Sequence, residues 1–152
     1  MLRSKVNSHI KLSLNYLLKK NYNLPIWASW NFSKWKRNTK LAKKISTYQL
    51  SWDITDFGSD NFDKIGLTLF TLRNGTLSEK NNIQYAEKLM VLKPNQAIPY
   101  HYHKRKIEDI INRYGGELEL GIYHTNNDKK IINYEIDSKT KHIKPFKKIK
   151  IS

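Results

Sequence analysis

Cysteine is absent from the 152-residue sequence, and so are long apolar runs. Without cysteine the chain has no disulfide bonds and no thiolate metal ligands, which is compatible with a reducing cytosol. No apolar run approaches the roughly 20 residues that span a membrane. The apolar residues between Val6 and Leu18 fall at helical spacing among polar ones, unlike the continuous apolar stretch of a signal peptide. We therefore expect a cytoplasmic protein with no membrane partner.

Acidic residues are also few. The chain has 13 aspartates and glutamates against 28 lysines and arginines, and its formal net charge is +15. A charge of this size raises nucleic acid as a partner. The basic residues, however, are spread from Lys5 to Lys150, and diffuse charge gives only weak, salt-sensitive association. The parallel enrichment in Asn, Ile and Tyr is what AT-rich codons produce, so we expect no specific nucleic-acid partner.

The residues that are present describe one folded domain, because 39% are hydrophobic and four are tryptophan. Three helices are predicted in the first fifty residues. The first covers about 4–20, the second is short and capped by Ser33, and the third covers 40–49. Residues 1–50 are thus interpreted as a helical extension of a single domain, 1–152, whose remaining part, 51–152, is β-structure.

Short strands separated by turn residues are predicted from there on. They cover residues 65–72, which end at the hairpin signal Asn74-Gly75, and then 85–92, 98–103, 117–123, 131–136 and 147–151. Such spacing indicates a mainly β fold, an antiparallel β-barrel or jelly roll with N-terminal α-helices. Five or six strands, the last cut short at Ser152, do not close a barrel, so we expect an incomplete barrel and a truncated sequence.

The most informative motif is His101-Tyr-His103, followed by Glu108 and Gly115. In an extended strand the two histidines project to the same side. Two imidazoles and one carboxylate can hold a divalent metal and leave coordination positions open, although a His-x-His pair also occurs as a simple surface feature. The spacing resembles the first motif of cupin barrels. One position departs: Asn95 stands where that motif has glycine, and asparagine also tolerates turn backbone.

Four segments extend the resemblance across nearly the whole chain: residues 50–58, 62–75, 85–90 and 108–113. Together they look like the D-lyxose isomerase family of cupins. The resemblance implies a cupin-like barrel and a Mn²⁺-dependent isomerase that interconverts D-lyxose and D-xylulose, often accepts D-mannose, and is usually a homodimer. It also implies that His101, His103 and Glu108 are metal ligands. The family's fourth ligand, a histidine in a proline-rich strand–turn segment, has no match at His124 or His142, so we expect it beyond residue 152.

Glu108 and Lys88 are the catalytic candidates, because isomerisation needs a group that handles a proton near the metal. Lys88 lies on a predicted strand next to the motif, but most lysines of such a chain simply face solvent. Asp109 is equally consistent with orienting a ligand imidazole and with an ordinary surface carboxylate. Asp53 and Asp56 are interpreted as side chains that cap a polar turn.

Residue type alone leaves alternatives open. Nitrogen and oxygen ligands suit Fe²⁺, Co²⁺ or Zn²⁺ as well as Mn²⁺, and two histidines with one carboxylate also form the iron site of non-haem oxygenases. A sugar-binding or inactive, truncated cupin is the alternative outside enzymes.

Overall fold

The computed structural model describes residues 1–75, 85–101, 108–122, 124–125, 131–132, 135–136, 143–144 and 147–151. The chain divides into two compact units, residues 1–99 and residues 100–152. The single domain expected from the sequence stays a prediction. In the described part of the chain, no helix is long and apolar enough to cross a membrane.

The first unit begins with helices, close to where the sequence predicted them. They are α1 (Arg3–Lys19), the short 3₁₀ helix η1 (Ile26–Ser29), α2 (Phe32–Arg37) and α3 (Thr39–Thr47). The predicted cap of the second helix is wrong. Asn31, in extended backbone, accepts a hydrogen bond from the Lys34 N–H at 3.0 Å, so α2 begins two residues earlier and Ser33 lies inside it.

Three antiparallel strands follow, β1 (Ser51–Thr55), β2 (Leu67–Arg73) and β3 (Glu87–Val91), in the order β1-β2-β3. The strands predicted at 65–72 and 85–92 are confirmed, and β2 ends directly before Asn74. The interpretation of Asp53 is wrong, because this residue lies within β1 and pairs with Leu69. Asp56 does cap a turn, since its carboxylate accepts a hydrogen bond from the Gly58 N–H at 3.1 Å.

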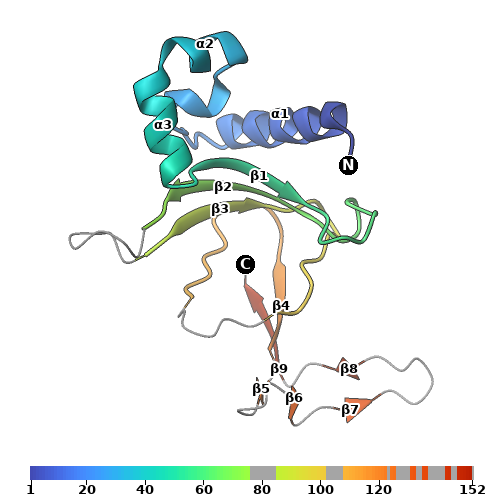
Figure 1. The fold of residues 1–152 in the computed structure, drawn as a ribbon. Coiled ribbons are helices and arrows are strands. Elements are labelled where there is room, and N and C mark those ends of the chain that lie inside the picture. Colours follow the sequence, from blue (N-terminus) through green and yellow to red (C-terminus); the bar gives the residue numbers. More distant parts are fainter. Residues whose placement is uncertain are drawn as a thin grey trace. The chain divides into compact units, whose positions relative to one another are not determined.

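The core of this unit lies between the sheet and the helices, which cover one face of it (Figure 1). Phe70 on β2 is fully buried. Its ring stacks on Trp27 at 5.1 Å and meets the edge of Trp52 at 4.9 Å, measured between ring centroids. The Trp52 indole N–H donates to the Ala28 carbonyl at 2.9 Å, which ties β1 to η1. Because side chains alternate along a strand, Leu69 and Thr71 belong to the opposite face.

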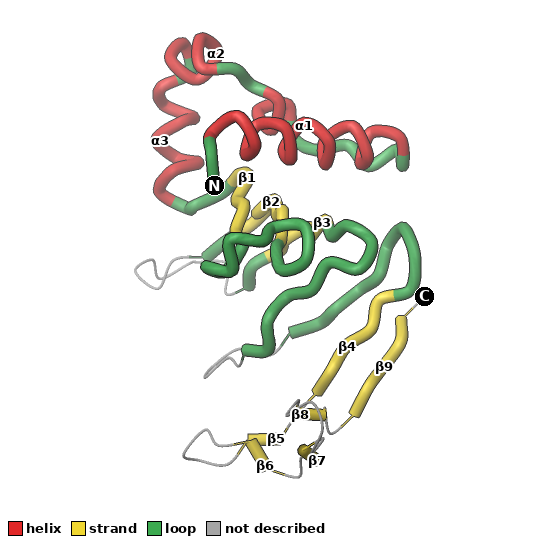
Figure 2. Tube along the Cα trace, turned by 90° about the vertical axis from the view of Figure 1, so that its right-hand side faces the viewer, coloured by secondary structure: helices red, strands yellow, loops and turns green. Residues whose placement is uncertain are grey.

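The second unit contains a two-stranded antiparallel ribbon of β4 (Leu118–Ile122) and β9 (Lys147–Ile151). Its strands run side by side in Figure 2. These two strands confirm the predictions at 117–123 and 147–151. Four strands of two residues pair as β5 (His124–Thr125) with β6 (Ile131–Ile132), and as β7 (Glu135–Ile136) with β8 (Ile143–Lys144).

Two predicted strands differ from the structure. The described residues of the strand expected at 131–136 are strand, but 131–132 in β6 and 135–136 in β7 belong to different sheets, and residues 133–134 lie outside the described residues. The strand expected at 98–103 does not form over its described part, residues 98–101. Ala97 makes an isolated bridge to Ile65, and Pro99 has no N–H to continue a ladder.

The predicted fold class is confirmed: the structure is mainly antiparallel β-sheet with helices at the N-terminus. Within the described ranges the strands form one three-stranded and three two-stranded sheets, none of which closes on itself. This arrangement agrees with the incomplete cupin-like fold expected from the sequence.

Candidate active site

The backbone is left-handed at both ends of the histidine motif. Asn95 has a φ of 61° and Gly115 a φ of 115°. Asparagine is among the few residues that tolerate the left-handed region, and glycine adopts it without steric cost. The expectation that Asn95 can replace the glycine of the cupin motif is therefore confirmed at the level of backbone conformation.

The metal-ligand candidates lie in the second unit. His101 and Glu108 stand in segments outside helices and strands, and their side chains are exposed, as is that of Asp109. His103 lies outside the described residues. Within those residues no three His, Cys, Asp or Glu side chains gather as a metal site. The set of His101, His103 and Glu108 therefore stays a prediction, as does the orienting role of Asp109.

The donor chemistry of that set fits a divalent transition metal. Imidazole nitrogens and a carboxylate oxygen, without sulfur, suit Mn²⁺ and also Fe²⁺, Co²⁺ and Zn²⁺. Three such donors leave positions at which a substrate oxygen can bind. The chemistry of the residues thus agrees with the Mn²⁺ expected from the family resemblance.

Lys88 lies in the first unit, on β3, and its side chain is exposed. In the sheet it pairs with Thr71 of β2, and Thr71 in turn pairs with Ser51 of β1. Together with Asp53, these residues lie on the face of the sheet opposite to Phe70. A groove of about 340 Å³ is lined by Gln49, Leu50, Ser51, Trp52, Asp53, Leu69, Thr71, Asn74 and Lys88.

The groove combines an ammonium group, a carboxylate, hydroxyls and side-chain amides. Hydroxyl groups of a ligand both donate and accept hydrogen bonds, so this mixture suits a polyhydroxylated molecule. Asp53 makes no ion pair or side-chain hydrogen bond within the part of the chain that the structure describes. The sequence analysis assigned Asp53 to a turn and not to the site, although the alternation of Ser51 and Asp53 with Trp52 and Ile54 is the pattern of a half-buried strand.

Comparison with known proteins agrees with the resemblance. The family model described as D-lyxose isomerase matches residues 1–152. A protein of Escherichia coli O157:H7 named D-lyxose/D-mannose isomerase is 36% identical over 138 residues, which are 90% of this chain and 61% of that protein. A Serratia proteamaculans protein of the same name is 37% identical over 125 residues, 81% of this chain and 55% of that protein. The chain thus spans little more than half the length of these relatives. Since the family model covers every residue, the chain belongs to the D-lyxose isomerase family.

Proposed function

We propose that this chain acts as a metal-dependent aldose–ketose isomerase that interconverts D-lyxose and D-xylulose, and also D-mannose and D-fructose. The observation that carries the proposal is the match of the D-lyxose isomerase family model to all 152 residues. Two relatives named for both sugars support it. The proposal includes Mn²⁺ as the metal and a cytoplasmic homodimer as the working form.

In this proposal His101, His103 and Glu108 hold the metal. Mn²⁺ bound there would supply Lewis-acid polarisation of the sugar carbonyl. The donor types and their spacing support this assignment, as does the left-handed backbone at Asn95 and Gly115.

Lys88 is proposed to handle a proton. Conversion of an aldose to a ketose moves one hydrogen from C2 to C1 and another from the C2 hydroxyl oxygen to the former carbonyl oxygen. An ammonium group can give a proton to the oxygen that gains one and recover it from the oxygen that loses one. The position of Lys88 in a polar groove with Asp53 and Thr71 supports a role in sugar binding or proton handling.

The test is isomerase activity of the purified chain after removal of metal with EDTA. D-lyxose and D-mannose are each assayed for ketose formation with Mn²⁺, under anaerobic conditions. Anaerobic turnover separates an isomerase from an iron oxygenase, which uses the same kind of ligand set but consumes oxygen. Binding of D-lyxose without turnover would instead favour a sugar-binding protein, and the absence of both would contradict the proposal.

Variants test the residue roles separately. Lys88→Met should lower kcat about 100-fold or more and leave Mn²⁺ affinity unchanged, since general acid–base groups contribute about 10²–10⁴-fold. Lys43→Met, which removes an exposed lysine on α3, is the matched control. Glu108→Gln and His101→Ala should weaken Mn²⁺ binding itself. Unchanged kcat in Lys88→Met would remove Lys88 from the mechanism.

A further inference from the structure

The segment before His101 is held against the β4–β9 ribbon. Tyr100, the residue directly before it, lays its ring across Gly121 of β4. A Cβ atom on Gly121 would stand 2.7 Å from Cε1 and 2.8 Å from Cζ of Tyr100, closer than real Cβ contacts allow. Tyr100 is 62% exposed, so its ring lies on the surface of the ribbon and not in a core. A larger residue at 121 would therefore displace the Tyr100 ring from this position.

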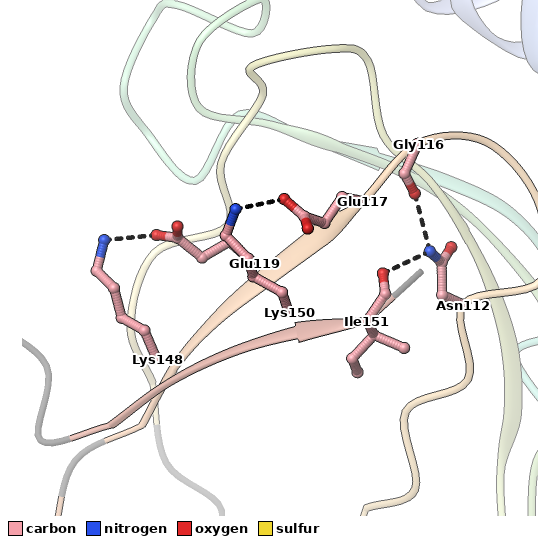
Figure 3. A network of polar contacts seen from close by, with 7 residues as sticks. All are labelled: Asn112, Gly116, Glu117, Glu119, Lys148, Lys150 and Ile151. Atoms are coloured by element: carbon pink, nitrogen blue, oxygen red, sulfur yellow. Dashed lines mark hydrogen bonds and ion pairs between the residues drawn. The ribbon is translucent and has the colours of Figure 1, made fainter.

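The segment after Glu108 is held by the same ribbon. The Asn112 side-chain amide donates to the Gly116 carbonyl at 2.9 Å and to the Ile151 carbonyl of β9 at 2.8 Å, as Figure 3 shows. A side-chain amide nitrogen carries two hydrogens, one for each carbonyl. Asn112 thus closes the turn that leads into β4 and fixes that turn to β9.

The strands of the ribbon are joined by backbone pairing and by ion pairs. Five residues of each strand pair in register, and ion pairs of 2.6 Å join Lys148 to Glu119 and Lys150 to Glu117 on one face (Figure 3). The Glu119 carboxylate is the main cause of the raised pKa of Lys148, and the Tyr100 phenol contributes to it. Because side chains alternate along a strand, Gly121 lies on the same face of β4 as Glu119, and the Tyr100 ring approaches that charged face.

We propose that the Tyr100–Gly121 contact and the Asn112 bridge are a positioning device, in which the β4–β9 ribbon fixes both ends of the segment that carries His101 and Glu108. The inference rests on the proposed function, because these two residues are its proposed metal ligands. A ligand residue binds a metal more tightly when its own backbone is already held in place, since less conformational entropy is lost on binding.

The first experiment needs no metal. Backbone ¹⁵N order parameters of His101 and Glu108 are measured in the EDTA-treated chain and in the variants Gly121→Ala and Asn112→Ala. We expect the His101 value to fall in Gly121→Ala and the Glu108 value to fall in Asn112→Ala. Gly116→Ala is the matched control, because a Cβ atom there meets no other atom within 4 Å. Unchanged order parameters in both variants would overturn the proposal, whether or not the chain binds metal.

A double-variant cycle separates positioning from a general requirement for glycine in β4. If Gly121 serves to admit the Tyr100 ring, Gly121→Ala should lower the order parameter of His101 no further once Tyr100→Ala has removed the ring. Additive losses would contradict the assignment. Asn112→Ala provides an independent arm if Gly121→Ala does not fold.

Measurement of Mn²⁺ affinity tests whether this positioning affects metal binding. Free Mn²⁺ is measured by electron paramagnetic resonance during titration of the wild-type chain, the two variants and the Gly116→Ala control. Residues that orient metal ligands typically change affinity about 10–100-fold, and we expect a loss in this range for both variants and a change within about twofold for the control. Equal affinity in all four proteins would refute the functional part. A wild-type chain that binds no Mn²⁺ would instead contradict the proposed function. The order parameters would still test whether the ribbon positions His101 and Glu108.

Discussion

Removal of the Phe70 side chain is the strongest test of the core between the sheet and the helices. Phe70 is fully buried and contacts the rings of Trp27 and Trp52. Truncation of a buried phenylalanine to alanine costs about 3–5 kcal/mol, and lost ring pairs add to lost burial. We expect Phe70→Ala to lower the free energy of unfolding by about 4 kcal/mol, a large share of the roughly 5–15 kcal/mol that stabilises a typical domain.

Urea unfolding followed by tryptophan fluorescence measures this loss. All four tryptophans lie within residues 1–99, so the signal reports on the unit that contains Phe70. Phe32→Ala is the control, since Phe32 is 73% exposed and its ring contacts the Lys36 ammonium at 4.8 Å. Such a contact contributes about 0.5–1 kcal/mol at an exposed site. A loss below about 1.5 kcal/mol for Phe70→Ala would refute the proposed packing, because it would mean that the site collapses without cost.

Three further predictions concern the backbone and pH. Gly115→Ala should cost about 1–3 kcal/mol in urea unfolding, because a φ of 115° strains any residue with a Cβ atom. The hydrogen bond from Lys148 lowers the pKa of Glu119 below its ordinary value of 4.5, so the stabilisation is complete above that value and is lost as pH falls through the lower folded pKa. A ¹³C NMR titration of the carboxyl group, compared with Lys148→Met, will measure the shift. Burial, and then the Lys93 charge, lowers the pKa of His9 below 6.5, so stability should fall as pH drops from 6.5 through the folded pKa, and His9→Phe should remove this dependence.

Each of these predictions has a result that contradicts it. Unfolding of Gly115→Ala at the wild-type urea concentration would show that the turn can relax without its positive φ. A Glu119 titration that is identical in the wild type and in Lys148→Met would exclude the ion pair in solution. An unfolding free energy whose dependence on pH is the same in His9→Phe as in the wild type would show that another group titrates in that range.

The helices and most of the longer strands could be predicted because their patterns are local. The apolar spacing of α1 and the alternation in β9 need no information about partners. The cap of α2 could not be chosen, because Asn31 and Ser33 are both good caps and the local backbone decides between them. The strand β1 was missed since Asp53 is a poor strand residue whose propensity is overridden by pairing with β2. The assignment of β6 and β7 to different sheets depends on strand partners, which alternation does not specify.

The candidate site, too, could be predicted only where it depends on local sequence. The spacing of His101, His103 and Glu108 could be found from the sequence alone, and so could the tolerance of Asn95 for left-handed backbone. The neighbours of Lys88 could not, because Thr71 is placed beside it only by the register of β2 and β3. Strand register is set by the packing of whole sheet faces. The pairs of residues that it brings together therefore cannot be predicted from a local sequence motif.

The acidic side chains of this chain are few, and most of the groove's polar character comes from other groups than Asp53. In a chain with 13 acidic and 28 basic residues, several acidic side chains join neighbouring strands or loops through ion pairs, as Glu87 does with Arg73 and Glu119 with Lys148. Asp53 differs, because it makes no ion pair within the part of the chain that the structure describes and yet lines the groove with Lys88. The oxygens of a carboxylate that forms no ion pair stay available to accept hydrogen bonds from hydroxyl groups. Hydroxyl groups of a polyhydroxylated ligand could donate to these oxygens and accept from the Lys88 ammonium group in the same groove.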